Sequence, residues 1–257
     1  MILGCNNQDA EKSKPESLVK AIGISVVKVY PHDTASFTQG LAFYKGKMYE
    51  GTGGAEYDPG SRLSRLMQVD LNTGKAEKSV TLPGKYFGEG ITILNDTLYQ
   101  LTWREHTVLV YTLPDLKKVK EFPISTEGWG ITHNGQELIV SDGSSNLYFY
   151  EPATFRLLHS QSITQDGELV NNINELEFID GSIYANQWQY PYILKINPET
   201  GIIDGIVNLS MIWDKLKRNH PQAANDVPNG IAYDAATKKI YITGKNWPEL
   251  YEVQFGQ

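Results

Sequence analysis

Residues 90–99 read Gly-Ile-Thr-Ile-Leu-Asn-Asp-Thr-Leu-Tyr, an apolar strand followed by a two-residue turn and a second strand. The opening phrase, a small or acidic residue and then alternating apolar residues, recurs at Gly40-Leu41-Ala42-Phe43, Gly130-Ile131-Thr132-His133, Glu175-Leu176-Glu177-Phe178 and Gly230-Ile231-Ala232-Tyr233. The copies start 40 to 55 residues apart, and a turn and a second strand follow each one. Two of these turns are Asn134-Gly135 and Asp180-Gly181, which tolerate the positive φ of tight hairpins. The chain therefore contains five copies of one hairpin.

A second hairpin completes the repeat. In the first copy, strands at residues 66–71 and 78–82 flank the turn Asn72-Thr73-Gly74. Four strands every 40 to 55 residues are typical of the blades of a β-propeller. A β-sandwich with irregular repeats is the alternative, but a sandwich does not predict the same phrase in every repeat.

Two segments depart from the repeat. The fifth copy ends at residues 250–255 and lacks its outermost strand, which the β-branched run at 22–30 can supply, so that no edge is left exposed. Residues 210–218 contain two apolar residues four positions apart and predict a short helix before the last blade. We therefore expect an all-β fold, a five-bladed β-propeller over residues 21–257 with an N-terminal strand that closes the last blade.

The composition limits the possible partners. The chain has 257 residues and a formal net charge of -7 at pH 7, without a cluster of Lys and Arg, which argues against a nucleic-acid partner. No run approaches the roughly 18 apolar residues of a membrane helix, so we expect no transmembrane segment. The single cysteine, Cys5, excludes an intrachain disulfide and a Cys-rich metal site.

The N-terminal segment predicts a location. Ile2-Leu3-Gly4-Cys5, followed by a polar stretch, resembles the end of a bacterial lipoprotein signal, in which the cysteine becomes lipidated. On this interpretation the protein is exported and lies in the periplasm or is held at the outer membrane of a bacterium by a lipid anchor at Cys5. The alternative is an incidental cysteine in a disordered leader. In both cases we expect residues 1–20 to be a leader or tether outside the core.

A propeller brings distant residues together, because the inner strand of every blade begins at the central channel. The residues just before the repeated phrase are Phe37, Gln39, Phe87, Glu89, Glu127, Trp129, Asn172, Asn174, Asn225, Asp226 and Asn229. The ends of the second strands add Glu50, Trp103, Ser141, Asp142, Trp188, Lys245 and Trp247. Aromatic walls with a few hydrogen-bonding groups predict a pocket for a small polar ligand.

Glu89 is the most informative of these residues. It lies between Gly88 and Gly90 and beside Phe87, which predicts an apolar surrounding and a raised pKa for the carboxyl group. Such a group can both accept and donate a proton. Alternatively, it only accepts hydrogen bonds from the channel backbone. The other candidates also have structural alternatives: each Trp can be packing, Gln39 and Asn174 can cap strands, and Lys245 can be a solvated surface charge.

Eight segments together resemble a known family. They are Phe37-Thr38-Gln39-Gly40-Leu41, Tyr86-Phe87-Gly88-Glu89-Gly90-Ile91-Thr92, Leu101-Thr102-Trp103, Glu127-Gly128-Trp129-Gly130, Asn174-Glu175-Leu176-Glu177, Ala185-Asn186-Gln187-Trp188, Asn225-Asp226-Val227-Pro228-Asn229-Gly230-Ile231-Ala232 and Thr243-Gly244-Lys245-Asn246-Trp247. In this order, from about residue 26 to 255, they resemble the glutamine cyclotransferase family, the plant and bacterial type of glutaminyl cyclase.

The resemblance implies a fold, an activity and a site. It implies a five-bladed propeller that converts N-terminal glutaminyl residues of peptides or proteins to pyroglutamyl residues, with release of ammonia and without a metal or other cofactor. By position it implies Glu89 as the general acid/base. It also implies a substrate pocket of Phe37, Gln39, Phe87, Trp103, Trp129, Asn174, Trp188 and Lys245. We expect the protein to be a monomer.

Three other functions are alternatives to the implied activity. A calcium-dependent, lactonase-like propeller hydrolase could use oxygen ligands such as those of Glu89, Asn174, Asp226 and Asn229. A zinc-dependent cyclase needs a histidine site, and His32, His106, His133, His159 and His220 lack ligand spacing. A non-catalytic propeller could bind a peptide end with the same aromatic mouth.

Overall fold

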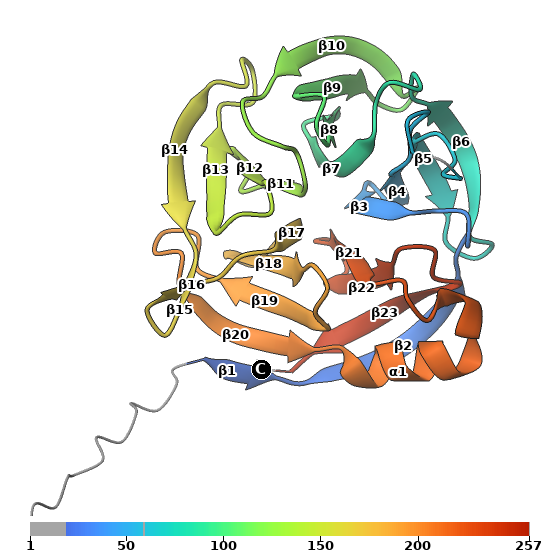
Figure 1. The fold of residues 1–257 in the computed structure, drawn as a ribbon, viewed down its shortest axis with the longest axis vertical. Coiled ribbons are helices and arrows are strands. Elements are labelled where there is room, and N and C mark those ends of the chain that lie inside the picture. The colour runs from blue at the N-terminus through green and yellow to red at the C-terminus, as the bar shows by residue number, and fades with distance from the viewer. Residues whose placement is uncertain (1–18, 59, 257) are drawn as a thin grey trace, which may run out of the picture.

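Five β-sheets surround a central channel in the computed structural model, which describes residues 19–58 and 60–256 (Figure 1). Blade 1 is formed by β3 (Thr38–Tyr44), β4 (Lys47–Thr52), β5 (Arg65–Asp70) and β6 (Lys75–Thr81). Blade 2 is formed by β7 (Gly88–Leu94), β8 (Thr97–Thr102), β9 (Thr107–Thr112) and β10 (Lys117–Pro123). The predicted five-bladed propeller is confirmed.

The other three blades follow the same order from the channel outwards. Blade 3 contains β11 (Ile131–His133), β12 (Leu138–Ser141), β13 (Asn146–Tyr150) and β14 (Leu157–Ser162). Blade 4 contains β17 (Ile173–Ile179), β18 (Ser182–Gln187), β19 (Tyr192–Ile196) and β20 (Ile203–Asn208), and a small hairpin of β15 (Thr164–Gln165) and β16 (Glu168–Leu169) precedes it. Blade 5 contains β21 (Pro228–Asp234), β22 (Lys239–Gly244) and β23 (Glu249–Phe255).

The N-terminal strand closes the ring as predicted. β2 (Ile24–Pro31) pairs antiparallel with β23 as the fourth strand of blade 5. The sequence did not predict β1 (Lys20–Ile22), which pairs parallel with β20 at the outer edge of blade 4. The N-terminal segment thus covers the edges of two neighbouring blades (Figure 1). Cys5 and most of the expected leader lie outside the described residues.

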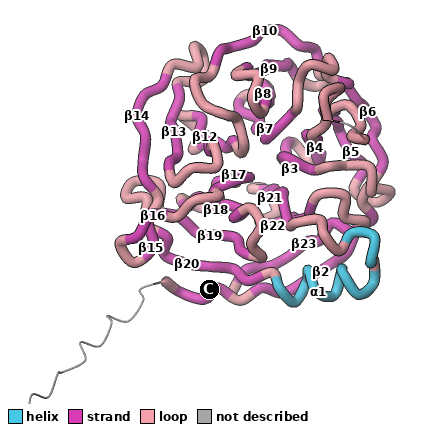
Figure 2. The backbone as a smooth tube through the Cα atoms, in the orientation of Figure 1, coloured by secondary structure: helices cyan, strands magenta, loops and turns pink. Residues whose placement is uncertain are grey.

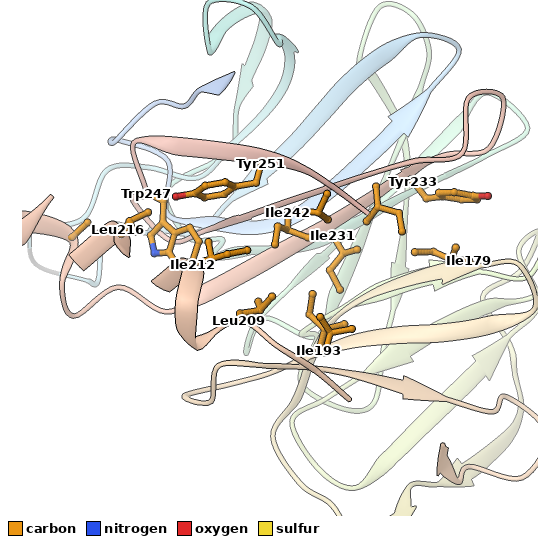
Figure 3. Close-up of a cluster of buried hydrophobic side chains, with 14 residues drawn as sticks. Ile179, Ile193, Leu209, Ile212, Leu216, Ile231, Tyr233, Ile242, Trp247 and Tyr251 are labelled. Atoms are coloured by element: carbon orange, nitrogen blue, oxygen red, sulfur yellow. The ribbon is translucent and has the colours of Figure 1, made fainter. Parts of the chain in front are cut away.

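The predicted helix is present as α1 (Ser210–Asn219), followed by the short 3₁₀ helix η1 (Pro221–Ala223). The two helices lie at the rim, and the rest of the described chain consists of strands and loops (Figure 2). The apolar face of α1 buries Ile212 and Leu216 in a cluster with Trp247, between blades 4 and 5 (Figure 3). Complete burial of one such leucine contributes about 2 kcal/mol. In the part of the chain that the structure describes, no helix has the length and apolar character needed to span a membrane.

The repeated phrase marks the close approach of inner strands. Each inner strand contacts the next around the ring, and β21 contacts β3 to complete it. A β-carbon at Gly40, Gly90 or Gly130 would lie only 2.1–2.7 Å from the backbone of the next inner strand or of the segment just before it, so these positions require glycine. In blade 4 the phrase begins with Glu175 instead, and its carboxylate accepts hydrogen bonds from the inner strands of blades 1 and 5.

Candidate active site

A cavity of about 490 Å³ opens at one end of the ring. Successive strands of a blade are antiparallel, so the segments before the inner strands and the loops after the second strands lie at the same end. The side chains that line the cavity come from all five blades and their connections. They are Phe37, Gln39, Asp58, Phe87, Glu89, Trp103, Trp129, Asn174, Trp188, Gln189, Asn225, Asp226, Val227 and Lys245.

The structure brings together all nine residues that the sequence singled out as catalytic or substrate-binding, and Asn225 and Asp226 with them. Other residues from the two convergent sets do not line the cavity. Trp247 is fully buried in the core of blade 5, and its indole Nε1 donates to the carbonyl of Asp226 at 3.1 Å. The prediction that Trp247 lies at the open end of the ring with the other convergent residues was wrong. The tight turn after β22 directs its indole into the sheet interior. Glu50 is also buried, bonded to His32 and Thr38.

The aromatic side chains form two connected groups in the wall. Phe37 meets Phe87 edge-on at 6.3 Å between ring centroids, and Phe87 meets Trp103 at 5.5 Å. In the second group, Trp129 meets Trp188 edge-on, also at 5.5 Å. Edge-to-face contacts of this kind each add about 0.5–1.5 kcal/mol to the burial of the rings. The wall is therefore largely preformed.

Glu127 fixes the direction of two indoles. Its Oε2 accepts hydrogen bonds from Nε1 of Trp103 at 2.9 Å and of Trp129 at 3.0 Å. Its Oε1 lies 3.4 Å from Nε of Arg104, and that guanidinium lies 3.7 Å from the Trp103 ring centroid. These two indole N–H groups are thus occupied by Glu127.

The Glu89 carboxylate is buried, with only 5% of the residue exposed. Its one hydrogen bond among the described residues comes from Nε2 of Gln39 at 3.0 Å. Burial raises the pKa of Glu89 well above its ordinary value; the positive charge of Lys245 opposes this, and the charges of Glu105 and Glu127 add to it. The direction agrees with the expectation from sequence, and the carboxylate keeps most of its hydrogen-bonding capacity for a ligand.

Lys245 is buried as well, with 6% exposed, so it is not a solvated surface charge. Burial lowers the pKa of its ammonium group to about 8, while the carboxylates of Glu89 and Asp226 act in the opposite direction. The Nζ atom lies 4.5 Å from the ring centroid of Phe37. A lysine with this pKa is cationic near neutral pH but can lose its proton in mildly alkaline solution.

Asn174 lines the cavity and is held in place by Asn229. Asn229 donates from Nδ2 to the carbonyl of Thr38 at 2.9 Å, so its Oδ1 is the atom that receives Nδ2 of Asn174, at 3.0 Å. Oδ1 of Asn174 then has no hydrogen-bond partner within residues 19–58 and 60–256, although it is buried. An unpaired buried oxygen is costly, and a substrate N–H could satisfy it.

Potential metal ligands are dispersed. Across the described ranges, no three His, Cys, Asp or Glu side chains are grouped to hold a metal ion. Of the residues weighed as calcium ligands, Asn174 and Asn229 bond to each other. His32, His159 and His220 each pair with a different carboxylate.

Sequence reasoning missed three cavity residues: Asp58, Gln189 and Val227. Asp58 comes from the loop between β4 and β5, which is longer than the matching loops and so falls outside the repeat. Gln189 directly follows Trp188, and Val227 directly follows Asp226. Inclusion of the immediate neighbours of the convergent positions would have found these two, but not Asp58.

Known proteins match this chain in sequence and in fold. The family model for glutamine cyclotransferase matches residues 1–255. The glutaminyl-peptide cyclotransferase of Arabidopsis thaliana is 38% identical over 237 residues, which make up 91% of this chain and 72% of that protein. The crystal structure of Myxococcus xanthus glutaminyl cyclase matches with a TM-score of 0.85 and 32% identity, covering 93% of this chain and 98% of that one. The chain belongs to the glutamine cyclotransferase family.

Proposed function

We propose that this protein converts N-terminal glutaminyl residues of peptides to pyroglutamyl residues and releases ammonia, with Glu89 as general acid/base and without a metal ion. Membership of the family supports the reaction. The observation that carries the assignment of Glu89 is its buried carboxylate, which lies in the aromatic cavity with one hydrogen bond and a raised pKa.

The reaction needs one proton to move from one nitrogen to another. The neutral α-amine attacks the γ-carbonyl carbon of the same residue, and a C–N bond closes the five-membered ring. As the bond forms, the amine nitrogen gives a proton to the Glu89 carboxylate. The protonated Glu89 then returns this proton to the γ-amide nitrogen, whose bond to carbon breaks as ammonia leaves. The carboxylate ends in its starting form.

The γ-carbonyl oxygen gains negative charge during the attack. Gln39 already donates to Glu89, and the indoles of Trp103 and Trp129 donate to Glu127. Asn174 offers an oxygen rather than an N–H. Lys245 is a buried cation of the cavity wall, and a positive charge stabilises an oxyanion that forms beside it, so we assign this role to Lys245. The free Oδ1 of Asn174 suits an N–H of the substrate amine.

The aromatic wall contributes by holding the substrate folded. Nucleophile and electrophile belong to one residue, so the main entropic cost is to fix the side chain in a ring-like shape. The preformed contacts among Phe87, Trp103, Trp129 and Trp188 provide rigid apolar surfaces for this. Exclusion of water from the same surfaces keeps the charges of Glu89 and Lys245 strongly interacting.

The experiment is to incubate the purified protein with a Gln-initiated dipeptide in the presence and absence of a chelator. We expect release of ammonia together with a peptide mass lower by one ammonia, at the same rate in both samples. A rate that collapses with chelator and recovers with calcium would favour the metal-dependent hydrolase. Tight peptide binding without any turnover would favour a binding protein.

A further inference from the structure

A second cavity, of about 410 Å³, adjoins the first. The two cavities share three lining residues: Phe37, Asp58 and Phe87. The remaining wall of the second cavity comes from the segment before β3, the loop between β4 and β5, and Asn246. Neither the repeat nor the family resemblance singled out this loop. The shared residues make the second space a continuation of the first.

The two phenyl rings at the junction depend on a glycine. A β-carbon at Gly53 would lie 2.3 Å from the ring of Phe87 and 3.1 Å from that of Phe37. Without a side chain at this position, the rings can meet edge-on and form the boundary between the cavities. The boundary is therefore built into the backbone of the loop that begins there.

The loop between β4 and β5 is tied to blade 2. The Tyr57 hydroxyl donates to Oε1 of Glu105 at 2.5 Å, and Oε2 of the same carboxylate accepts the backbone N–H of Phe87 at 3.2 Å. Within the loop, the Ser61 hydroxyl bonds to both the N–H and the carbonyl of Ala55, at 3.2 Å each. The Glu105 carboxylate thus connects the loop that forms part of the second cavity to Phe87, which lines both cavities.

The second cavity differs chemically from the first. Aromatic rings dominate the first cavity, whereas glycines, Thr34, Ser61 and Asn246 give the second many small groups and accessible polar atoms. Such a lining suits an extended peptide main chain, in which every residue carries an N–H and a carbonyl. Two extended residues span about 7 Å, so the chain after the glutamine soon reaches beyond the first cavity.

The two charged residues of the second cavity, Asp58 and Arg62, lie at different places in it. Asp58 lines both cavities and thus lies at their junction, whereas Arg62 lines only the second. Arg62 is exposed and makes no ion pair within the part of the chain that the structure describes. A guanidinium in this position can receive a carboxylate from a bound peptide.

We propose that the second cavity binds the second and third residues of the peptide whose N-terminal glutamine occupies the first, and that Arg62 favours an acidic third residue. The inference rests on the proposed function, and it assigns the enzyme a preference for peptides over the isolated amino acid amide. The polar groups of the second cavity contact the main chain of the bound peptide. Arg62 contacts the side chain of its third residue.

The length preference can be tested with the wild-type protein alone. Steady-state rates are compared for glutaminamide and for the tripeptide amide Gln-Ala-Ala-NH₂. A few main-chain hydrogen bonds should lower KM for the tripeptide by about tenfold. Equal KM values with good turnover of glutaminamide would overturn the second cavity as a subsite and leave the proposed function standing. Absence of turnover with every substrate would overturn both.

The charge preference is tested with Gln-Ala-Glu-NH₂ and Gln-Ala-Lys-NH₂ at low ionic strength. An exposed ion pair is worth up to about 1 kcal/mol, so kcat/KM for the wild type should favour the acidic peptide by about two- to fivefold. In Arg62→Glu the ratio should invert. The ratio is measured on one enzyme preparation, so partial misfolding does not affect it.

Arg156→Glu is the matched control. Arg156 follows the turn between β13 and β14, at the opposite end of the ring from the cavities, and the change in net charge is the same. We expect this variant to keep the wild-type ratio. An unchanged ratio in Arg62→Glu, or an equal inversion in both variants, would show that Arg62 does not contact the third residue.

Discussion

Glu89 and Glu175 are buried carboxylates of inner strands, and burial raises the pKa of each well above its ordinary value. They differ in their hydrogen bonds. Glu175 accepts the backbone N–H of Leu41 on one oxygen and of Ile231 on the other, and it thereby joins blade 4 to blades 1 and 5. Glu89 accepts one side-chain amide and faces a cavity. A raised pKa therefore does not identify a catalytic acid in this molecule, whereas unused hydrogen-bonding capacity beside a cavity separates the two residues.

The largest effect is expected for Glu89→Gln, which tests whether the carboxylate beside the cavity is the catalytic one. The amide has the same shape but cannot carry the proton, so kcat should fall by about 10²–10⁴-fold. Circular dichroism should remain that of the wild type, and the urea midpoint should not fall, because the neutral amide avoids the cost of burying the Glu89 charge. A variant that keeps more than about a tenth of the wild-type rate would show that Glu89 contributes less than general acid/base catalysis usually does.

The next largest effect is expected at Lys245, as a decline of kcat at alkaline pH. The pKa of Lys245 is lowered to about 8, so its positive charge is lost as the pH rises through that value. Because we propose that this charge stabilises the oxyanion, kcat at saturating substrate should fall in the same pH range. Lys245→Arg keeps its charge, so this alkaline decline should disappear even if the maximal rate is lower. Persistence of the decline in the arginine variant would assign it to another group.

The sequence predicted the blades well because they rest on local, repeated causes. Where glycine opens the phrase, inner strands approach each other closely, and such a requirement is visible in one chain. Closure by β2 followed from counting strands. The parallel pairing of β1 could not be predicted from a run of three residues, since its partner β20 lies far along the chain.

The candidate site was predictable in position but not in orientation. Chain order and the five-fold repeat suffice to place Glu89, Lys245 and the tryptophans at one end. The direction of each polar atom depends on partners outside the repeat. Glu127 occupies two indole N–H groups, and Asn229 determines which atom of Asn174 is left without a partner among the described residues. Asp58 was missed because its loop has no counterpart in the other blades.

Glu127 offers a third and smaller effect, on substrate capture. In Glu127→Ala the two indoles lose their shared acceptor, and a loss of about 1 kcal/mol in positioning should raise KM by about three- to tenfold. In Glu127→Gln one oxygen can still receive both N–H groups, so KM should stay near that of the wild type. The negative charge of Glu127 also raises the pKa of Glu89, so the acid limb of kcat should move to lower pH in both variants. Equal KM values in the alanine and glutamine variants would indicate that the indoles do not depend on this acceptor.

Glu175→Gln should have the smallest effect on turnover. It tests whether the role of this second buried carboxylate is structural. The glutamine oxygen can accept from one backbone N–H, but its NH₂ group then faces the other donor, which should cost about 1–3 kcal/mol of unfolding free energy. The kcat of folded protein should stay close to that of the wild type, because Glu175 does not line the cavity. The folded-state pKa lies above the ordinary value of 4.5, so Glu175 stabilises the fold most at low pH, and this contribution is lost as the pH rises. Urea midpoints measured across pH should therefore fall less steeply above pH 4.5 in the glutamine variant than in the wild type. A large loss of kcat with an unchanged midpoint would place Glu175 in the reaction and remove the distinction between the two carboxylates.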